Sequence, residues 1–136
     1  MSSLMRTVLA IDPGRCKCGI AVVRSEAGLE TLYRQVVETS NIVPLVSGLM
    51  ARFHPDVVII GNGTTSARAA EAIAEIGIAR VEFVDEKNTT LLARKRYFQE
   101  NPPRGLRTLI PISLQTPSHP CDDYAAVILA EQYLSR

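Results

Sequence analysis

The sequence is poor in cysteine, has almost no excess charge of either sign, and contains no long apolar run. Its three cysteines, Cys16, Cys18 and Cys121, are an odd number, which argues against a disulfide framework. No apolar run approaches the roughly 20 residues that span a bilayer. Residues 1–5 lack the charged-then-apolar pattern of a signal peptide. We therefore expect a cytoplasmic protein that does not bind membranes.

The bulk composition is that of one soluble globular domain. The chain has 136 residues, of which 46% are hydrophobic and 21% charged, enough apolar sequence for a core without room for a second domain of ordinary size. Internal repeats, low-complexity segments and linkers are absent from the sequence, so we expect a single domain over residues 1–136. The net charge of +1 does not by itself indicate a nucleic-acid partner, so that inference must rest on where the charges lie.

The hydrophobic pattern changes period along the chain. Two short apolar runs, 6–11 and 19–23, and an alternating segment, 29–37, are separated by the turns at Pro13-Gly14 and Ala27-Gly28, which predicts an antiparallel meander. Apolar residues then recur at helical spacing. Three antiparallel strands followed by β-α units predict a mixed α/β sheet of five strands flanked by helices. The later elements are predicted as helix 42–53, strand 57–60, a helix to about 76, strand 81–84, a helix to about 100, and helix 122–134.

Acidic residues fall at the ends of three of these elements. Asp12 ends the first strand, Asp85 and Glu86 follow the last, and Asp122 and Asp123 begin the final helix. Each has an ordinary explanation alone, as a turn residue or as a negative charge at a helix N-terminus. In this topology the first strand is central, and the element ends can converge on one sheet edge. Carboxylates there could bind two Mg²⁺ ions about 4 Å apart, an arrangement that supports phosphodiester cleavage.

Three stretches of the sequence also resemble a known family. They are 8–14 continuing through 19–22, then 84–90 with Ala93, and 122–134. In this order and spacing they are similar to the first hairpin, the Asp-Glu-Arg-x-Thr-Thr segment and the terminal helix of the YqgF (RuvX) family of Holliday-junction resolvases and pre-16S rRNA-processing nucleases, relatives of the RuvC resolvases. The chain departs from the usual family pattern at Arg15, at Lys87 and over 61–65, where it has no acid.

The resemblance implies a ribonuclease-H-like fold and a metal-dependent endonuclease. It implies that Asp12, Glu86 and Asp122 are catalytic metal ligands and that the cofactor is Mg²⁺ or Mn²⁺. In the nuclease hypothesis Asp123 is a reserve ligand beside them. The implied substrate is a DNA junction or an rRNA precursor, as expected of a protein in DNA recombination or ribosome biogenesis. Related resolvases act as dimers, so the resemblance leaves a homodimer open.

Basic residues cluster around these acids. Such clusters can bind a phosphate backbone even at low net charge, and the interleaved Tyr97 and Phe98 could stack on bases. The alternative is a solvated helix face with Phe98 in the core and Tyr97 packed as well. The residues expected to contact nucleic acid are Arg15, Lys17, Arg94, Arg96, Arg104 and Arg107.

The cysteines and histidines permit a second kind of metal site. Cys16 and Cys18 with His119 and Cys121 could bind zinc, but their spacing matches no common zinc module. Unligated thiols are the simpler interpretation. His119 could also assist proton transfer near Asp122, although a loop histidine without that role is the simpler expectation.

Three functions are compatible with these features. The first is the metal-dependent nuclease, and the second is a non-catalytic nucleic-acid-binding module with the same fold. The third is an actin-like kinase or ATPase, because Asp12-Pro13-Gly14 in a hairpin resembles the first phosphate loop of that superfamily. Its members need two lobes and several hundred residues, so the length of this chain argues against it.

Overall fold

The computed structural model of the chain describes residues 5–14, 16–63, 66–78, 80–85, 89–101 and 122–135, without the side chains of residues 66, 89–91, 94 and 122. The segment 102–121, between the two last predicted helices, falls outside these ranges. Among the predicted contact residues, Arg15, Arg104 and Arg107 also lie outside the described residues, as do Glu86 and His119.

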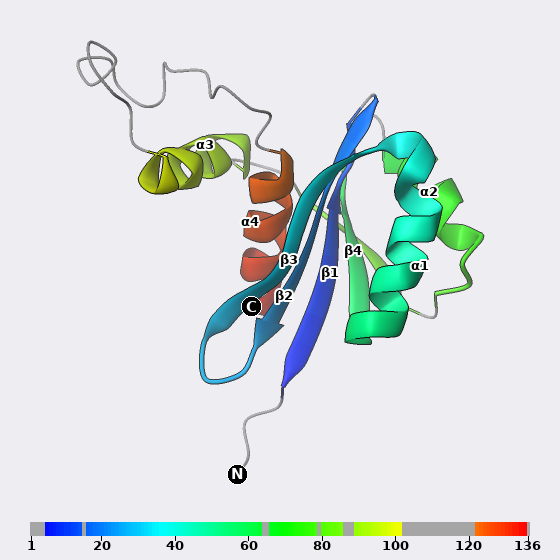
Figure 1. Cartoon of the computed structure of the whole chain (residues 1–136), viewed down its shortest axis with the longest axis horizontal. Coiled ribbons are helices and arrows are strands. Elements are labelled where there is room, and N and C mark those ends of the chain that lie inside the picture. Colours follow the sequence, from blue (N-terminus) through cyan, green and yellow to red (C-terminus); the bar gives the residue numbers. More distant parts are fainter. Residues whose placement is uncertain are drawn as a thin grey trace.

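The strands form one mixed sheet in the order β3-β2-β1-β4-β5 (Figure 1). Strands β1, β2 and β3 are antiparallel neighbours, whereas β4 runs parallel to β1 and β5 parallel to β4. The predicted meander and the central place of the first strand are therefore confirmed. Strand β2 exceeds the predicted 19–23 because it pairs with β1 on one side and with β3 on the other. The strands are β1 Arg6–Asp12, β2 Lys17–Ser25, β3 Leu29–Glu38, β4 Val57–Gly61 and β5 Val81–Val84.

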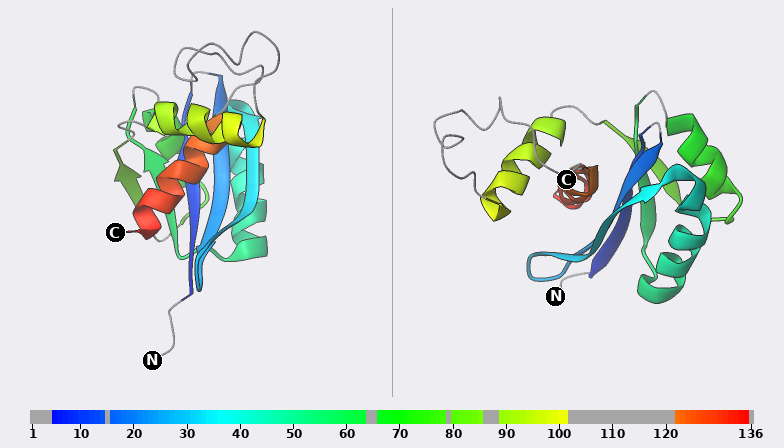
Figure 2. Two further views of the ribbon diagram at one scale, coloured as in Figure 1. Left: turned by 90° about the vertical axis from the view of Figure 1, so that its left-hand side faces the viewer. Right: turned by 45° about the horizontal axis from the view of Figure 1, so that its top comes forward.

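Helices cover both faces of the sheet. Helices α1 and α2 lie on one face, α4 crosses the other face, and α3 packs on the outer side of α4 (Figures 1 and 2). Helix α2 ends before the predicted residue 76, and the 3-10 helix η1 was not predicted. No helix within the described ranges is long and apolar enough to cross a membrane. The helices are η1 Thr39–Asn41, α1 Ile42–Phe53, α2 Ser66–Ala74, α3 Thr89–Glu100 and α4 Asp122–Leu134.

Strand β1 is buried on both faces because its side chains alternate between two apolar layers. Leu9 and Ile11 belong to the layer under α1 and α2, whereas Val8 and Ala10 belong to the layer under α4. Full burial of a side chain such as Leu9 contributes about 1.5–3 kcal/mol. The unbroken Val/Ile run of β4 is likewise buried along its whole length, as its sequence predicts for a strand covered on both faces.

The three parallel strands end at the same edge of the sheet. Strands β1, β4 and β5 run in the same direction and end at Asp12, Gly61 and Val84, and we call this end the carboxyl edge. Helix α4 begins at this end and runs back along the sheet (Figure 1). Near its far end, the Tyr133 ring lies 5.6 Å from the guanidinium of Arg6, at the start of β1. The first turn of α4 therefore lies toward the carboxyl edge.

Candidate active site

Asp12 is the last residue of the central strand. Side chains alternate along β1, so Asp12 shares the α4 face with Val8 and Ala10, and its side chain is half-buried. Its register partner on β2 is Gly19. On the other side, Ile60 of β4 pairs with Ile11, so the next residue of β4, Gly61, lies beside Asp12. Both neighbouring strands therefore have a glycine at the register position beside Asp12.

Strands β4 and β5 continue the carboxyl edge beside Asp12. The backbone N–H of Asn62 donates to the carbonyl oxygen of Val84 at 2.7 Å, which joins the two strand ends. The Val84 side chain is buried in the α4 layer, and the exposed Asp85 follows it directly. The predicted ligand Glu86 is the next residue in the chain and lies outside the described residues.

The first turn of α4 is bound to the edge strand β3. One guanidinium nitrogen of Arg34 lies 2.9 Å from Oδ2 of Asp123, whose side chain is only 13% exposed. The same guanidinium stacks 4.2 Å from the centre of the Tyr124 ring. Burial raises the pKa of Tyr124, while the charge of Arg34 acts in the opposite direction. Together, the ion pair and the cation–π contact contribute on the order of 1–2 kcal/mol and position the start of α4.

The same contacts bear on the four predicted metal ligands. Asp12 lies at the carboxyl edge, and Asp122 begins the helix whose first turn Arg34 holds, although its side chain is outside the described part. Asp123 forms an ion pair with Arg34, which its predicted role as a reserve metal ligand did not include. Among the described residues, no three His, Cys, Asp or Glu side chains form a group that could bind a metal. Two of the three principal ligands lie outside that search.

Part of the basic cluster on α3 takes part in an ion pair within the protein. Arg96 pairs with Glu131 of α4, with one guanidinium nitrogen 2.7 Å from Oε1, so its charge helps to join the two helices. Lys17 is exposed at the start of β2, close in the chain to Asp12. The backbone of Arg94 belongs to α3, and its side chain is not described. The nucleic-acid contacts of all the predicted basic residues remain predictions.

The expectation that Tyr97 and Phe98 stack on bases is wrong, because neither ring is accessible on the protein surface. Both residues are buried, at 7% and 4% exposure. The Tyr97 ring makes edge-to-face contacts with Phe98, at 5.1 Å between centroids, and with Tyr124 of α4, at 5.8 Å. These rings form the interface between α3 and α4, so the packing alternative is the correct one. The local sequence could not show this, because the partner helix lies beyond a long intervening segment.

The two cysteines of the first hairpin differ in their exposure to solvent. Cys18 is fully buried in the layer under α1 and α2, with its sulfur 3.5 Å from the hydroxyl oxygen of Thr39. Cys16 is exposed. Cys121 lies outside the described residues together with His119, so the zinc alternative remains a prediction. The burial of Cys18 is explained by packing alone.

The comparisons with known proteins bear on the fold. No known family model and no curated protein sequence matches the chain. The structure is similar to Thermus thermophilus RuvC in complex with a Holliday junction substrate, with a TM-score of 0.58 and 20% identity over 91% of this chain and 90% of that one. The fold is ribonuclease-H-like. A second Thermus thermophilus RuvC structure has a TM-score of 0.53 and 20% identity over 94% of both chains. The RuvC likeness confirms the predicted fold class, and at this identity it shows the fold alone.

Two arginines that occupy notable positions in the structure were not predicted from the sequence as functional residues. Arg34 holds the start of α4, and Arg68 of α2 lies on the wall of a pocket. Neither residue belongs to a basic run, and the sequence around each carries no recognisable motif. Their roles depend on contacts between distant segments, such as the pairing of Arg34 with a residue 89 positions away.

Proposed function

We propose that this protein is a metal-dependent endonuclease that cuts phosphodiester bonds in structured nucleic acid in the cytoplasm. The observation that carries the proposal is the placement of Asp12 at the carboxyl end of the central strand, on the α4 face and between Gly19 and Gly61. The RuvC-like fold supports this proposal, since sites of α/β proteins form outside the carboxyl ends of their strands. One of those RuvC structures holds a Holliday junction substrate.

The residues at the carboxyl edge fit a hard divalent cation. Mg²⁺ and Mn²⁺ prefer carboxylate oxygens and retain positions for water and phosphate. In the proposal, Asp12, Glu86 and Asp122 hold the metal. Glycines at both register positions beside Asp12 would allow an ion and a phosphate oxygen to approach its carboxylate. When bound, the metal would activate water and stabilise the charge that develops on the phosphate oxygens.

The protein's own residues would position this chemistry. Asp12 is fixed by β1, whose backbone pairs with strands on both sides, so its carboxylate does not depend on a mobile loop. Arg34 holds the first turn of α4 through Asp123 and Tyr124, and this anchors the backbone that carries Asp122. We therefore assign Asp123 to positioning in preference to metal binding. Basic groups around the edge, among them Lys17, would offset the repulsion between substrate phosphates and the acids.

Cleavage by purified protein tests this proposal. The substrates are a labelled four-way DNA junction and an RNA that carries the 5′ end of a 16S rRNA precursor, because a Holliday-junction resolvase and an rRNA-processing nuclease of the YqgF (RuvX) type differ in this preference. We expect specific cutting of one polymer in Mg²⁺ or Mn²⁺ and none in EDTA. Sedimentation with and without the preferred polymer determines whether the active form is a homodimer.

A non-catalytic binding module is the second candidate. It is favoured by the absence of an acid at Gly61, the end of β4, and by the commitment of Asp123 to Arg34. Salt-sensitive binding of either polymer, with no cutting in any metal, would establish this candidate and reject the nuclease.

A further inference from the structure

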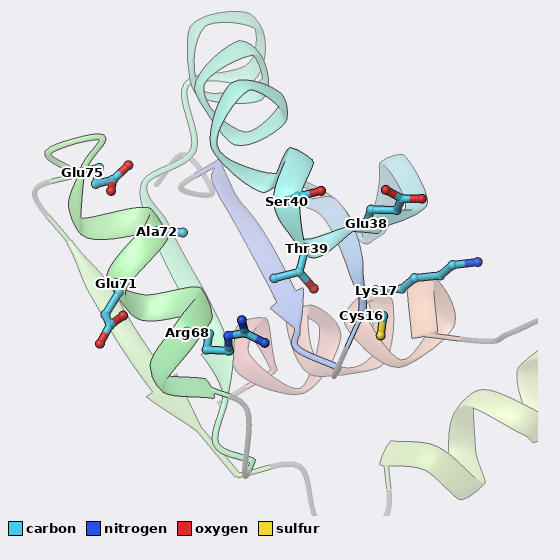
Figure 3. A pocket seen from close by; sticks show the side chains of 9 residues that line it. All are labelled: Cys16, Lys17, Glu38, Thr39, Ser40, Arg68, Glu71, Ala72 and Glu75. Carbon is cyan, nitrogen blue, oxygen red and sulfur yellow. The ribbon is translucent and has the colours of Figure 1, made fainter.

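A pocket of about 550 Å³ opens on the face of the sheet opposite α4. It lies between α2 on one side and the start of β2 with η1 on the other (Figure 3). The turn that follows Asp12 leads directly into Cys16 and Lys17 on its wall, so the pocket adjoins the carboxyl edge. The residues that line it are Cys16, Lys17, Glu38, Thr39, Ser40, Arg68, Glu71, Ala72 and Glu75.

Arg68 differs from the other arginines whose side chains are described. It has neither an ion pair nor an aromatic partner among the described residues. Each of the others lies against a carboxylate or an aromatic ring, namely Arg6, Arg24, Arg34, Arg52, Arg80 and Arg96. Thus no carboxylate among the described residues neutralises the charge of Arg68.

The direction of the Arg68 side chain is equally informative. Glu71 is three residues further along the same helix, a spacing at which opposite charges commonly pair. Figure 3 shows the two side chains apart, with the guanidinium of Arg68 extended across the pocket toward Thr39 and Cys16, and the carboxylate of Glu71 turned away. The pocket therefore has an unpaired guanidinium directed into it.

The charges in the pocket are divided between its two ends. Arg68 and the hydroxyl of Thr39 occupy the end beside the first hairpin, where Lys17 and Glu38 place opposite charges on one wall, whereas Glu75 lies at the opposite end of α2 (Figure 3). A guanidinium matches the geometry of a phosphate oxygen pair, and a hydroxyl can donate a further hydrogen bond. Glu75 at the other end would repel a second phosphate. The pocket is therefore suited to one anionic group and not to a long polyanionic track.

We propose that this pocket is a subsite for one backbone phosphate of the nucleic-acid substrate, bound by Arg68 with the hydroxyl of Thr39. This inference rests on the proposed function for the identity of the ligand. A strand that passes Asp12 at the carboxyl edge would extend over the first hairpin to the opposite face of the sheet and reach Arg68 there. The substrate is then contacted on both sides of the sheet edge, which orients it across the Asp12 carboxylate.

The salt dependence of binding tests the subsite without requiring cleavage. Affinity for the DNA junction and the precursor-like RNA is measured in EDTA from about 50 to 200 mM salt, and the slope of log K against log salt reports the number of phosphates neutralised. We expect Arg68→Ala to weaken binding and to reduce the slope by about 0.9 for a duplex and about 0.7 for a single strand. Arg68→Lys should retain most of the slope because it keeps the charge.

Arg24→Ala is the matched control, because Arg24 pairs with Glu30 toward the other end of β2. An unchanged slope in Arg68→Ala, an equal loss in Arg24→Ala, or no salt-dependent binding by the wild type would overturn the inference. If the wild type cuts but Arg68→Ala keeps its slope, only the subsite is wrong. If the slope falls as expected but the wild type never cuts, the nuclease is wrong and the subsite stands.

Discussion

Asp12→Asn is expected to reduce metal-dependent cleavage at least about a hundredfold, the scale on which removal of one preorganised electrostatic group lowers a rate. The amide keeps the shape of the carboxylate but not its charge. Asp12 ends a strand that pairs on both sides, so the substitution should leave the backbone in place. The loss should therefore appear in kcat, with nucleic-acid affinity in EDTA retained or slightly increased as one repulsive charge disappears.

Asp56→Asn is the control for this experiment. Its Oδ2 accepts a hydrogen bond of 2.8 Å from the backbone N–H of Thr7, at the opposite end of β1. This variant makes the same chemical change at a residue bound to the far end of the same strand, and it should lower stability modestly while cleavage stays near the wild-type rate. Circular dichroism and thermal unfolding verify the fold of both variants. Full activity in Asp12→Asn would reject the carboxylate site.

Gly14→Ala should have the second large effect, because the turn after Asp12 has no space for a side chain. A Cβ at this position would lie 2.4 Å from the backbone carbonyl oxygen of Lys17, closer than real Cβ contacts. The oxygen belongs to the main chain, so the β1–β2 turn must move to accept the methyl group. We expect the free energy of unfolding to fall by about 1–3 kcal/mol, as for other forced insertions, and cleavage to fall with it as Asp12 shifts.

Gly48→Ala is the matched substitution with the opposite sign. Gly48 lies inside α1, and a Cβ there would meet nothing within 4 Å. Alanine favours the helix by up to about 1 kcal/mol over glycine, so this variant should be as stable as the wild type or more so, and equally active. Denaturant unfolding of the two variants side by side measures both effects. A Gly14→Ala variant as stable as Gly48→Ala would show that the turn tolerates the methyl group.

The fold could be predicted from the sequence where local patterns and global packing agree. The Val/Ile run of β4 is apolar without interruption because both of its faces are covered. The apolar run of β1 and the turn at Pro13-Gly14 likewise specify a strand and its end. Asp12 was identified as a candidate for the same reason, since it is the acid at which a buried strand ends.

The side chains of the candidate site were harder to predict, because their partners lie far away in the chain. Arg96 belongs to a basic run that indicates phosphate binding, yet its guanidinium pairs with Glu131 of α4. Arg34 and Asp123 are 89 positions apart, and neither residue's neighbours indicate the pair. Tyr97 was open to two interpretations until the packing of α3 on α4 placed its ring against Tyr124. Tertiary contacts, which local periodicity does not encode, decide such roles.

Metal binding at the carboxyl edge is tested most directly by titrating ¹⁵N-labelled protein with Mg²⁺ and following the backbone amides by NMR. This experiment needs no knowledge of the substrate. The account predicts saturable shifts that concentrate at residues 12, 14, 61–63 and 85 and in the first turn of α4, and that disappear in Asp12→Asn. Shifts spread over exposed acids such as Glu26 and Glu30, or shifts that persist unchanged in Asp12→Asn, would contradict it.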